Sequence, residues 1–101
     1  MGFDISFYDK QGNTIEVYEV SEKLHNAIFN TGNLWKSYHQ LRKMADYYMN
    51  KVVYDHHELL ELRSDLERYL MFIDSKHQNE YEILKMKVNG STVRRIFVAG
   101  D

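Results

Sequence analysis

The chain has 101 residues, 44% of them hydrophobic and 14% aromatic, and this composition supports a folded core and argues against disorder. This length predicts one domain, residues 1–101, because two domains would leave two cores too small to be stable. Thirteen basic and fifteen acidic residues give a net charge of −2, so direct binding to free nucleic acid is not expected.

The chain contains no cysteine, which excludes disulfides and thiolate metal ligands. No stretch approaches the roughly 20 apolar residues of a membrane span. The first residues carry neither the basic nor the apolar part of a signal peptide. Together these features predict a cytoplasmic protein that does not enter a membrane.

The first twenty residues predict a β-hairpin. Apolar and polar side chains alternate over residues 3–8 and again over residues 14–20, as they do in half-buried strands. Residues 9–13 between them form a turn sequence in which Gly12 can adopt a positive φ. Because an isolated hairpin is at best marginally stable, helices must cover its apolar face.

Helical signals follow the hairpin. Ser21 can cap a short helix that ends near residue 31. The clearest helical spacing then extends from residue 34 to residue 52, with Leu34, Tyr38, Leu41, Ala45, Tyr48 and Val52 on one face. Residues 52–54 either end this helix or begin a connection.

Asp55 and Glu58 form a capping-box pair that predicts the start of another helix. Its inward face would carry Leu59, Leu62, Leu66, Tyr69 (or Leu70) and Ile73, and its exposed face Glu58, Glu61, Arg63, Asp65, Glu67 and Arg68. Asp74 and Ser75 can cap a last helix that ends near Val88. Asn89 and Gly90 then predict a turn, and residues 92–98 a final strand.

We therefore predict an α+β fold in which an N-terminal β-hairpin and a C-terminal strand form a small sheet packed by three to four helices. The strand that follows the helices is expected to return and pair with the hairpin. The pattern leaves open whether it lies at the edge of the sheet or beside the first strand.

Histidines are the most informative polar residues. Without cysteine, a metal site needs imidazole and carboxylate ligands. Asp4 lies in the first strand, on the face opposite to Phe3 and Ile5, and would need a partner if helices also cover that face. We predict a zinc site formed by Asp4, His25 and one or two further histidines. These are drawn from His39, His56 and His57, with His39 and His57 preferred. The alternative is that the histidines are surface and capping residues.

Protein binding is the second functional expectation. Acidic side chains on the helix that starts at Asp55, namely Glu58, Glu61 and Asp65, could meet basic residues of a partner. Tyr47 lies off the inward stripe of the preceding helix, and exposed tyrosines are typical of interfaces. An alternative is that these aromatic rings fill the core or lie scattered on the surface.

Catalytic motifs are absent from the sequence. It has no glycine-rich phosphate loop, no nucleophile elbow and no cysteine nucleophile. Glu58 and Glu61 beside His57 could act as acid and base, but a capped, charged helix explains them more simply. The sequence therefore favours a protein that is not an enzyme.

The opening residues 1–13, which read MGFDISFYDKQGN, resemble a group of small phage and prophage proteins. Those proteins begin with Met-Gly, an aromatic residue or leucine, Asp-Ile and a Lys-x-Gly turn. The resemblance extends to Leu24, His25 and Asn26, where some of them carry Thr-His-Asn, so Leu24 departs from the pattern. It covers about a quarter of the chain.

Small acidic phage proteins of this kind include anti-CRISPR proteins, so the resemblance implies a phage-encoded inhibitor that binds a host CRISPR effector nuclease stoichiometrically. Any zinc would then be structural and would tie the hairpin to the helices. One alternative is a small metal-dependent hydrolase or nucleotide-processing enzyme that uses the same histidines and carboxylates. Another is a regulatory or structural phage protein, such as a homodimer.

Overall fold

The structure is a computed structural model that describes residues 3–46 and 52–100. Four strands and four α-helices are found in these residues, with short 3₁₀ helices between them. The strands are β1 (Phe3–Tyr8), β2 (Thr14–Val20), β3 (Val52–Tyr54) and β4 (Arg95–Gly100). The α-helices are α1 (Glu22–Phe29), α2 (His39–Lys43), α3 (His56–Tyr69) and α4 (Gln78–Val88). The 3₁₀ helices are η1 (Leu34–Ser37), η2 (Met44–Asp46), η3 (Leu70–Phe72) and η4 (Ser75–His77).

The predicted hairpin is confirmed, because β1 and β2 pair in antiparallel fashion. Gly12 adopts a φ of +86°, as the turn requires. The Asp9 carboxylate closes the turn by accepting hydrogen bonds from the backbone N–H groups of Gln11 and Asn13, both at 2.9 Å.

The sheet has the strand order β2-β1-β4-β3, and all its pairs are antiparallel. The C-terminal strand returns to the hairpin as predicted, and it lies beside β1, where Ile5 faces Val98. The expectation that residues 52–54 form a helix end or a connection is wrong, since they form the edge strand β3. A strand of three residues is too short for alternation to be recognised in the sequence.

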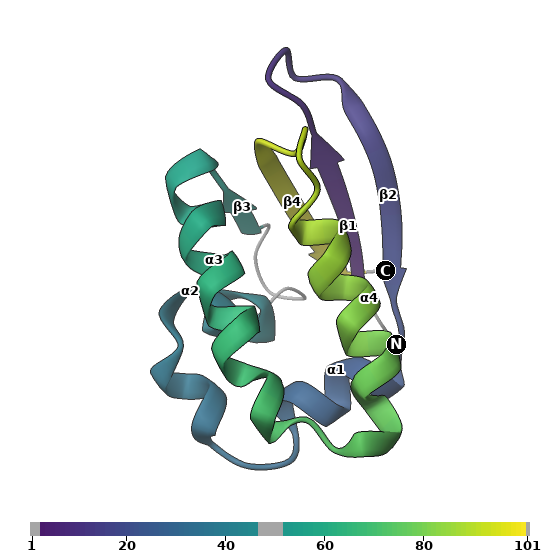
Figure 1. The fold of residues 1–101 in the computed structure, drawn as a ribbon, viewed down its shortest axis with the longest axis vertical. Helices are drawn as coiled ribbons and strands as arrows, with labels where there is room; N and C mark the ends of the chain where they lie inside the picture. The colour runs from purple at the N-terminus through teal and green to yellow at the C-terminus, as the bar shows by residue number, and fades with distance from the viewer. Residues whose placement is uncertain (1–2, 47–51, 101) are drawn as a thin grey trace.

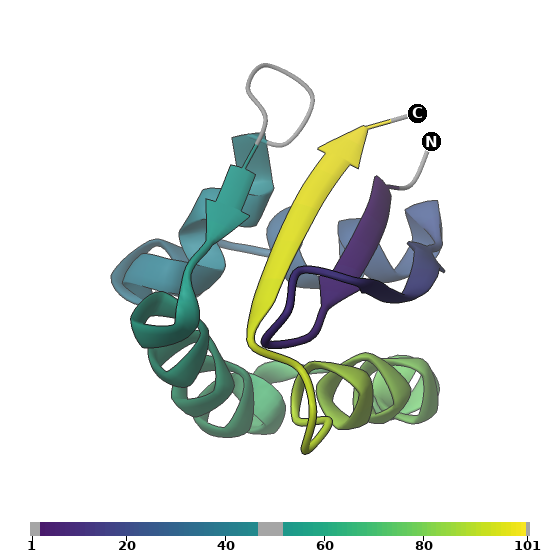
Figure 2. The ribbon, with the colours of Figure 1, turned by 90° about the horizontal axis from the view of Figure 1, so that it is seen from above.

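The helices lie on one side of this sheet (Figures 1 and 2). Phe3, Ile5 and Phe7 of β1 are at most 1% exposed, whereas the side chains between them are half-buried. The face toward the helices is therefore the core of the protein. It is completed by Val20, Leu24, Ile28, Leu41, Met44, Tyr54, Leu59, Leu62, Leu66, Tyr81, Leu84, Val88, Ile96 and Val98, all fully buried.

The prediction of one continuous helix over residues 34–52 is wrong. Residues 34–46 instead form η1, α2 and η2, and residues 47–51 lie outside the described part. The chain is extended at Tyr38, with φ −102° and ψ 95°, so the helical path is interrupted there. Leu41 and Met44 still reach the core, whereas Leu34 is 55% exposed. The spacing was therefore informative about burial but not about continuity.

The predicted capping box of α3 is confirmed. The Asp55 carboxylate accepts a hydrogen bond from the Glu58 N–H at 2.8 Å, and the Glu58 carboxylate accepts one from the Asp55 N–H at 3.1 Å. The inward stripe is confirmed as well: Leu59, Leu62, Leu66, Tyr69 and Ile73 are at most 3% exposed.

Asp65 was expected on the exposed face of this helix, and that expectation is wrong. Its side chain is 9% exposed and points from α3 to the start of α2. There the carboxylate accepts hydrogen bonds from the backbone N–H groups of Gln40, at 2.9 Å, and Leu41, at 3.2 Å. Tyr38, which precedes α2, makes no side-chain cap of its own. Asp65 therefore caps α2 from another helix and favours a helix start at this point.

Replacing Asp65 tests this role. We expect Asp65→Ala to lower the free energy of unfolding by about 2–3 kcal/mol, because two N–H groups lose a charged acceptor. Asp65→Asn keeps one acceptor oxygen and should cost less. The control Glu67→Gln alters a carboxylate that is 67% exposed and should stay within about 0.5 kcal/mol of the original protein. Urea unfolding followed by circular dichroism measures all three, and equal effects of Asp65→Ala and Glu67→Gln would refute the cap.

Candidate functional site

The residues predicted to bind zinc lie in different environments. Asp4 is half-buried on the face of β1 that points away from the helices. His25 lies on α1, on the helix side, where its ring packs against Phe3 and Phe29 at centroid distances of 5.6 and 5.0 Å. The condition under which Asp4 would need a partner, that helices also cover its face of β1, is not met by the described helices, and Asp4 and His25 point to different sides of the sheet.

The other predicted ligands are exposed. His39 is the first residue of α2, and His56 and His57 form the start of α3. The His57 Nε2 atom lies 4.0 Å from a Glu61 carboxylate oxygen, and both side chains are more than half exposed. In residues 3–46 and 52–100, no three His, Asp or Glu side chains lie close enough together to hold a metal ion. Zinc binding stays a prediction from the sequence.

The residues predicted to meet a partner also differ in their surroundings. Glu58 accepts a hydrogen bond from Lys43 at 2.8 Å, and this contact is the main reason why the pKa of its carboxyl lies below the usual range. Glu61 accepts a hydrogen bond from the Gln40 side chain at 3.0 Å. Asp65 is buried as the cap of α2, so it is not available to a partner. Tyr47 lies outside the described residues.

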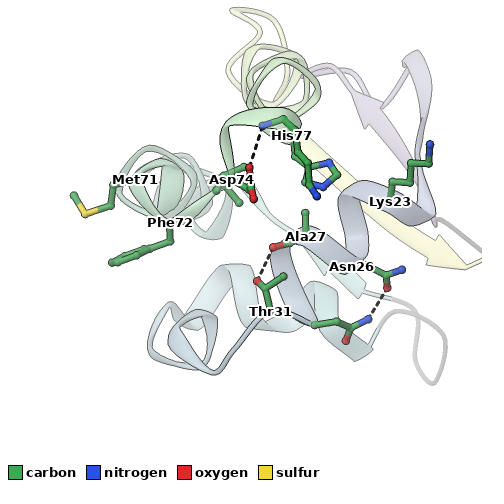
Figure 3. A pocket seen from close by; sticks show the side chains of 11 residues that line it. Lys23, Asn26, Ala27, Thr31, Met71, Phe72, Asp74 and His77 are labelled. Atoms are coloured by element: carbon green, nitrogen blue, oxygen red, sulfur yellow. Dashed lines mark hydrogen bonds between the residues drawn. The ribbon is translucent and has the colours of Figure 1, made fainter.

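A groove of about 860 Å³ lies between α1 and the segment that joins α3 to α4 (Figure 3). Its position follows from Tyr69, whose hydroxyl donates a hydrogen bond to the Ile28 carbonyl at 3.1 Å and so holds α1 against the end of α3. The groove is lined by Lys23, Asn26, Ala27, Asn30, Thr31, Met71, Phe72, Ile73, Asp74, Lys76 and His77.

The lining combines an apolar floor with polar walls. Ala27 and Ile73 are 7% and 3% exposed and form the floor, whereas Met71 at one end is 78% exposed. Lys23 on α1 and Lys76 in η4 are both exposed. The His77 ring points between the two segments (Figure 3). An exposed methionine beside polar side chains is typical of surfaces that adapt to a binding partner.

Hydrogen bonds within the chain already use several polar groups of this groove. The Thr31 hydroxyl donates to the Ala27 carbonyl at 2.9 Å, and the Asn30 amide donates to the Asn26 side chain. The Asp74 carboxylate accepts from the Lys76 N–H at 3.2 Å and caps η4. The groove therefore offers an apolar floor, two lysine charges and the Asp74 carboxylate, and hydrogen bonds within the chain hold its walls in place.

Sequence reasoning did not identify this groove. Met71 and Phe72 resemble core residues by composition, but they fall off the inward stripe that Leu66, Tyr69 and Ile73 define. That mismatch was the available signal that both side chains face solvent. The opposite wall comes from α1, about forty residues earlier in the chain, and no local pattern could place it there.

Comparison of the chain with protein-family models, curated proteins and solved structures finds no match. Among the described helices, none combines the length and the apolar character needed to cross a bilayer.

The environment of His25 predicts a pH dependence of stability. Burial is the main reason why the pKa of its imidazole lies below the ordinary value of 6.5. The unfolded chain therefore binds a proton first as the pH falls through about 6.5, so the free energy of unfolding should decrease below that pH and stay constant above it. Urea unfolding from about pH 7.5 to about pH 5.5 measures the decrease. In His25→Gln the decrease should be smaller, and an unchanged pH profile would contradict the prediction.

The zinc prediction has its own test. If the chain binds zinc through His25, elemental analysis of protein purified without a histidine tag should find about one zinc per chain, and His25→Ala should lose it. Chelation should then lower the melting temperature of the original protein only. Metal at background level in the original protein would remove the site, and with it the metal-dependent enzyme as an alternative.

Proposed function

We propose that this chain is a protein-binding module that acts by stoichiometric association and catalyses no reaction. The observation that carries the proposal is the open groove between α1 and the segment from Met71 to His77. Most of its lining side chains are exposed, and an active site usually shields its reacting groups from water. Its floor of Ala27 and Ile73 suits an apolar side chain inserted from a partner.

The chemistry of the partner follows from the groove. Lys23 and Lys76 favour a segment that carries acidic side chains beside an apolar anchor. Met71 can adjust its shape to such an anchor, because its side chain is flexible and unbranched. On α3, Glu58 and Glu61 supply negative charge that would assist the encounter with a basic region of the same partner.

The resemblance of residues 1–13 to phage proteins gives the proposal its specific form. In this form the protein is a phage-encoded inhibitor, similar to anti-CRISPR proteins, and acts in the cytoplasm of the host cell. Its target would be a CRISPR effector nuclease, to which it would bind as a protein ligand. The net charge of −2 supports contact with the nuclease itself and not with its nucleic acid.

Titration against purified CRISPR effector nucleases of several types tests this proposal. We expect cleavage by one of them to stop once the inhibitor equals the enzyme in molar amount. Calorimetry of that pair should give a stoichiometry of about one inhibitor chain per nuclease molecule. If none of the effectors binds, the CRISPR form of the proposal fails. The broader proposal of a protein-binding module then depends on finding another partner whose binding is weakened by a substitution in the groove.

A matched pair of methionine variants tests the groove. We expect Met71→Asp to weaken partner binding at least about tenfold, because it places a charge at the apolar end of the groove. Met86→Asp makes the same change on α4, where Met86 is 65% exposed and does not line the groove, and should leave the affinity unchanged. Both variants should melt close to the original protein, since both side chains face solvent. Equal affinities of the two variants would place the interface elsewhere.

A further inference from the structure

The face of the sheet opposite to the helices is not covered by any described helix (Figure 2). The alternation in β1 and β4 places the half-buried side chains of both strands on this face. We call it the open face. Antiparallel sheets commonly have one face packed on the core and the other in contact with solvent, so the exposure of this face does not by itself indicate a binding surface. The arrangement of its side chains is more informative.

An apolar row crosses the middle of the open face. The strand register aligns Val17 with Ser6, Ser6 with Phe97, and Phe97 with Val53, so that all four strands contribute one residue. Val17 is 58% exposed and Val53 is 49% exposed, and Phe97 is half-buried between its neighbours. A row of this kind on an uncovered sheet is a candidate interface.

The two ends of the open face carry opposite charges. At one end the register aligns Glu19 with Asp4, and Glu19 is exposed. At the other end Arg95 lies beside Tyr8, with its guanidinium carbon 5.0 Å from the centre of the tyrosine ring. The face is therefore acidic at one end, apolar in the middle and basic at the other end.

We propose that the open face binds a second copy of this chain to form a two-fold symmetric dimer. A two-fold axis along the apolar row would stack Phe97 against its equivalent and place Arg95 of each copy over the end that carries Glu19 in the other. Sheets that pack face to face lie about 10 Å apart and cross at about 30°, a separation that arginine and glutamate side chains from the two copies can bridge. Both copies use the same surface, as such symmetry requires.

The charges favour this occupant over nucleic acid. The exposed Glu19 would repel phosphate groups, whereas a second copy presents its Arg95 there. Four strands, of which β1 and β4 have six residues, β2 seven and β3 three, give a face of at most about 20 Å by 20 Å. Such an area is small for a permanent dimer, so we expect a reversible dimer that forms at micromolar or higher concentrations.

Analytical ultracentrifugation at low ionic strength tests the dimer through charge reversal. The original protein should show a concentration-dependent monomer–dimer equilibrium. Arg95→Glu makes both ends of the face acidic, and Glu19→Arg adds positive charge at the acidic end, so each variant alone should be at least about tenfold weaker in self-association. Lys36→Glu reverses an exposed charge in η1, on the helix side of the sheet, and serves as the control with unchanged association.

Complementation separates an interface contact from a structural role. An equal mixture of Arg95→Glu and Glu19→Arg should form heterodimers, because each acidic end then meets a basic end. The double variant Arg95→Glu/Glu19→Arg should recover self-association. A defect in folding would not be rescued by either combination.

Three results would overturn the proposal: a monomeric original protein at every concentration, a dimer that neither reversal weakens, or single variants that neither mixing nor combination restores. These outcomes are independent of the proposed partner groove, which lies on the helix side of the sheet and is probed by Met71→Asp.

Discussion

The pairing of the first strand with the last strand holds the sheet, and with it the whole fold, together. β1 and β4 are the two central strands, and Ile5 faces Val98 across more than ninety positions of the chain. The core side of the sheet is complete only when β4 has returned, and β3 can join only through β4. Closing so long a loop costs conformational entropy that the burial of Phe3, Ile5 and their neighbours must offset. The helices between β1 and β4 in the sequence must therefore fold so that these two strands can pair.

One-sided burial follows from this arrangement and leaves two candidate binding surfaces. The helices cover the face that carries Phe3 and Ile5, and the contact of Tyr69 with Ile28 leaves a groove where α1 meets the turn after α3. The opposite face keeps Val17, Phe97 and Val53 at the surface. In our proposals, the groove receives a segment of a different protein and the open face pairs with a second copy of the chain. If the proposed dimer forms, it would present two grooves to a partner, which raises the effective affinity if the partner has two equivalent sites.

Polar side chains between α2 and α3 stabilise the fold through contacts that cannot be recognised from their sequence pattern. Asp65 caps α2, Lys43 pairs with Glu58, and the Tyr54 hydroxyl donates to the Gln40 carbonyl. Burial in this contact raises the pKa of the Tyr54 hydroxyl above its ordinary value of 10.0, so the tyrosine is a neutral donor at any physiological pH. Acidic residues that look like a surface strip are thus partly committed within the chain. We therefore expect the groove to contribute more to the affinity for a partner than the acidic face of α3 does.

Patterns in the sequence are sufficient to predict the hairpin, the cap and inward stripe of α3, the return of the last strand and the α+β class. These features depend on side-chain alternation, helical spacing and capping within a few residues, which are local properties. These patterns did not predict that the helix expected over residues 34–52 breaks at Tyr38, because Asp65 reaches that point from α3. Nor did they reveal β3, the position of β4 beside β1, or the groove, since each depends on segments that meet only in the folded chain. Asp4 and His25 illustrate the same limit: their residue types suggested one site, and the sheet, packed on one side only, directs them to different faces. Local patterns specify elements, whereas long-range packing decides which side chains share a surface.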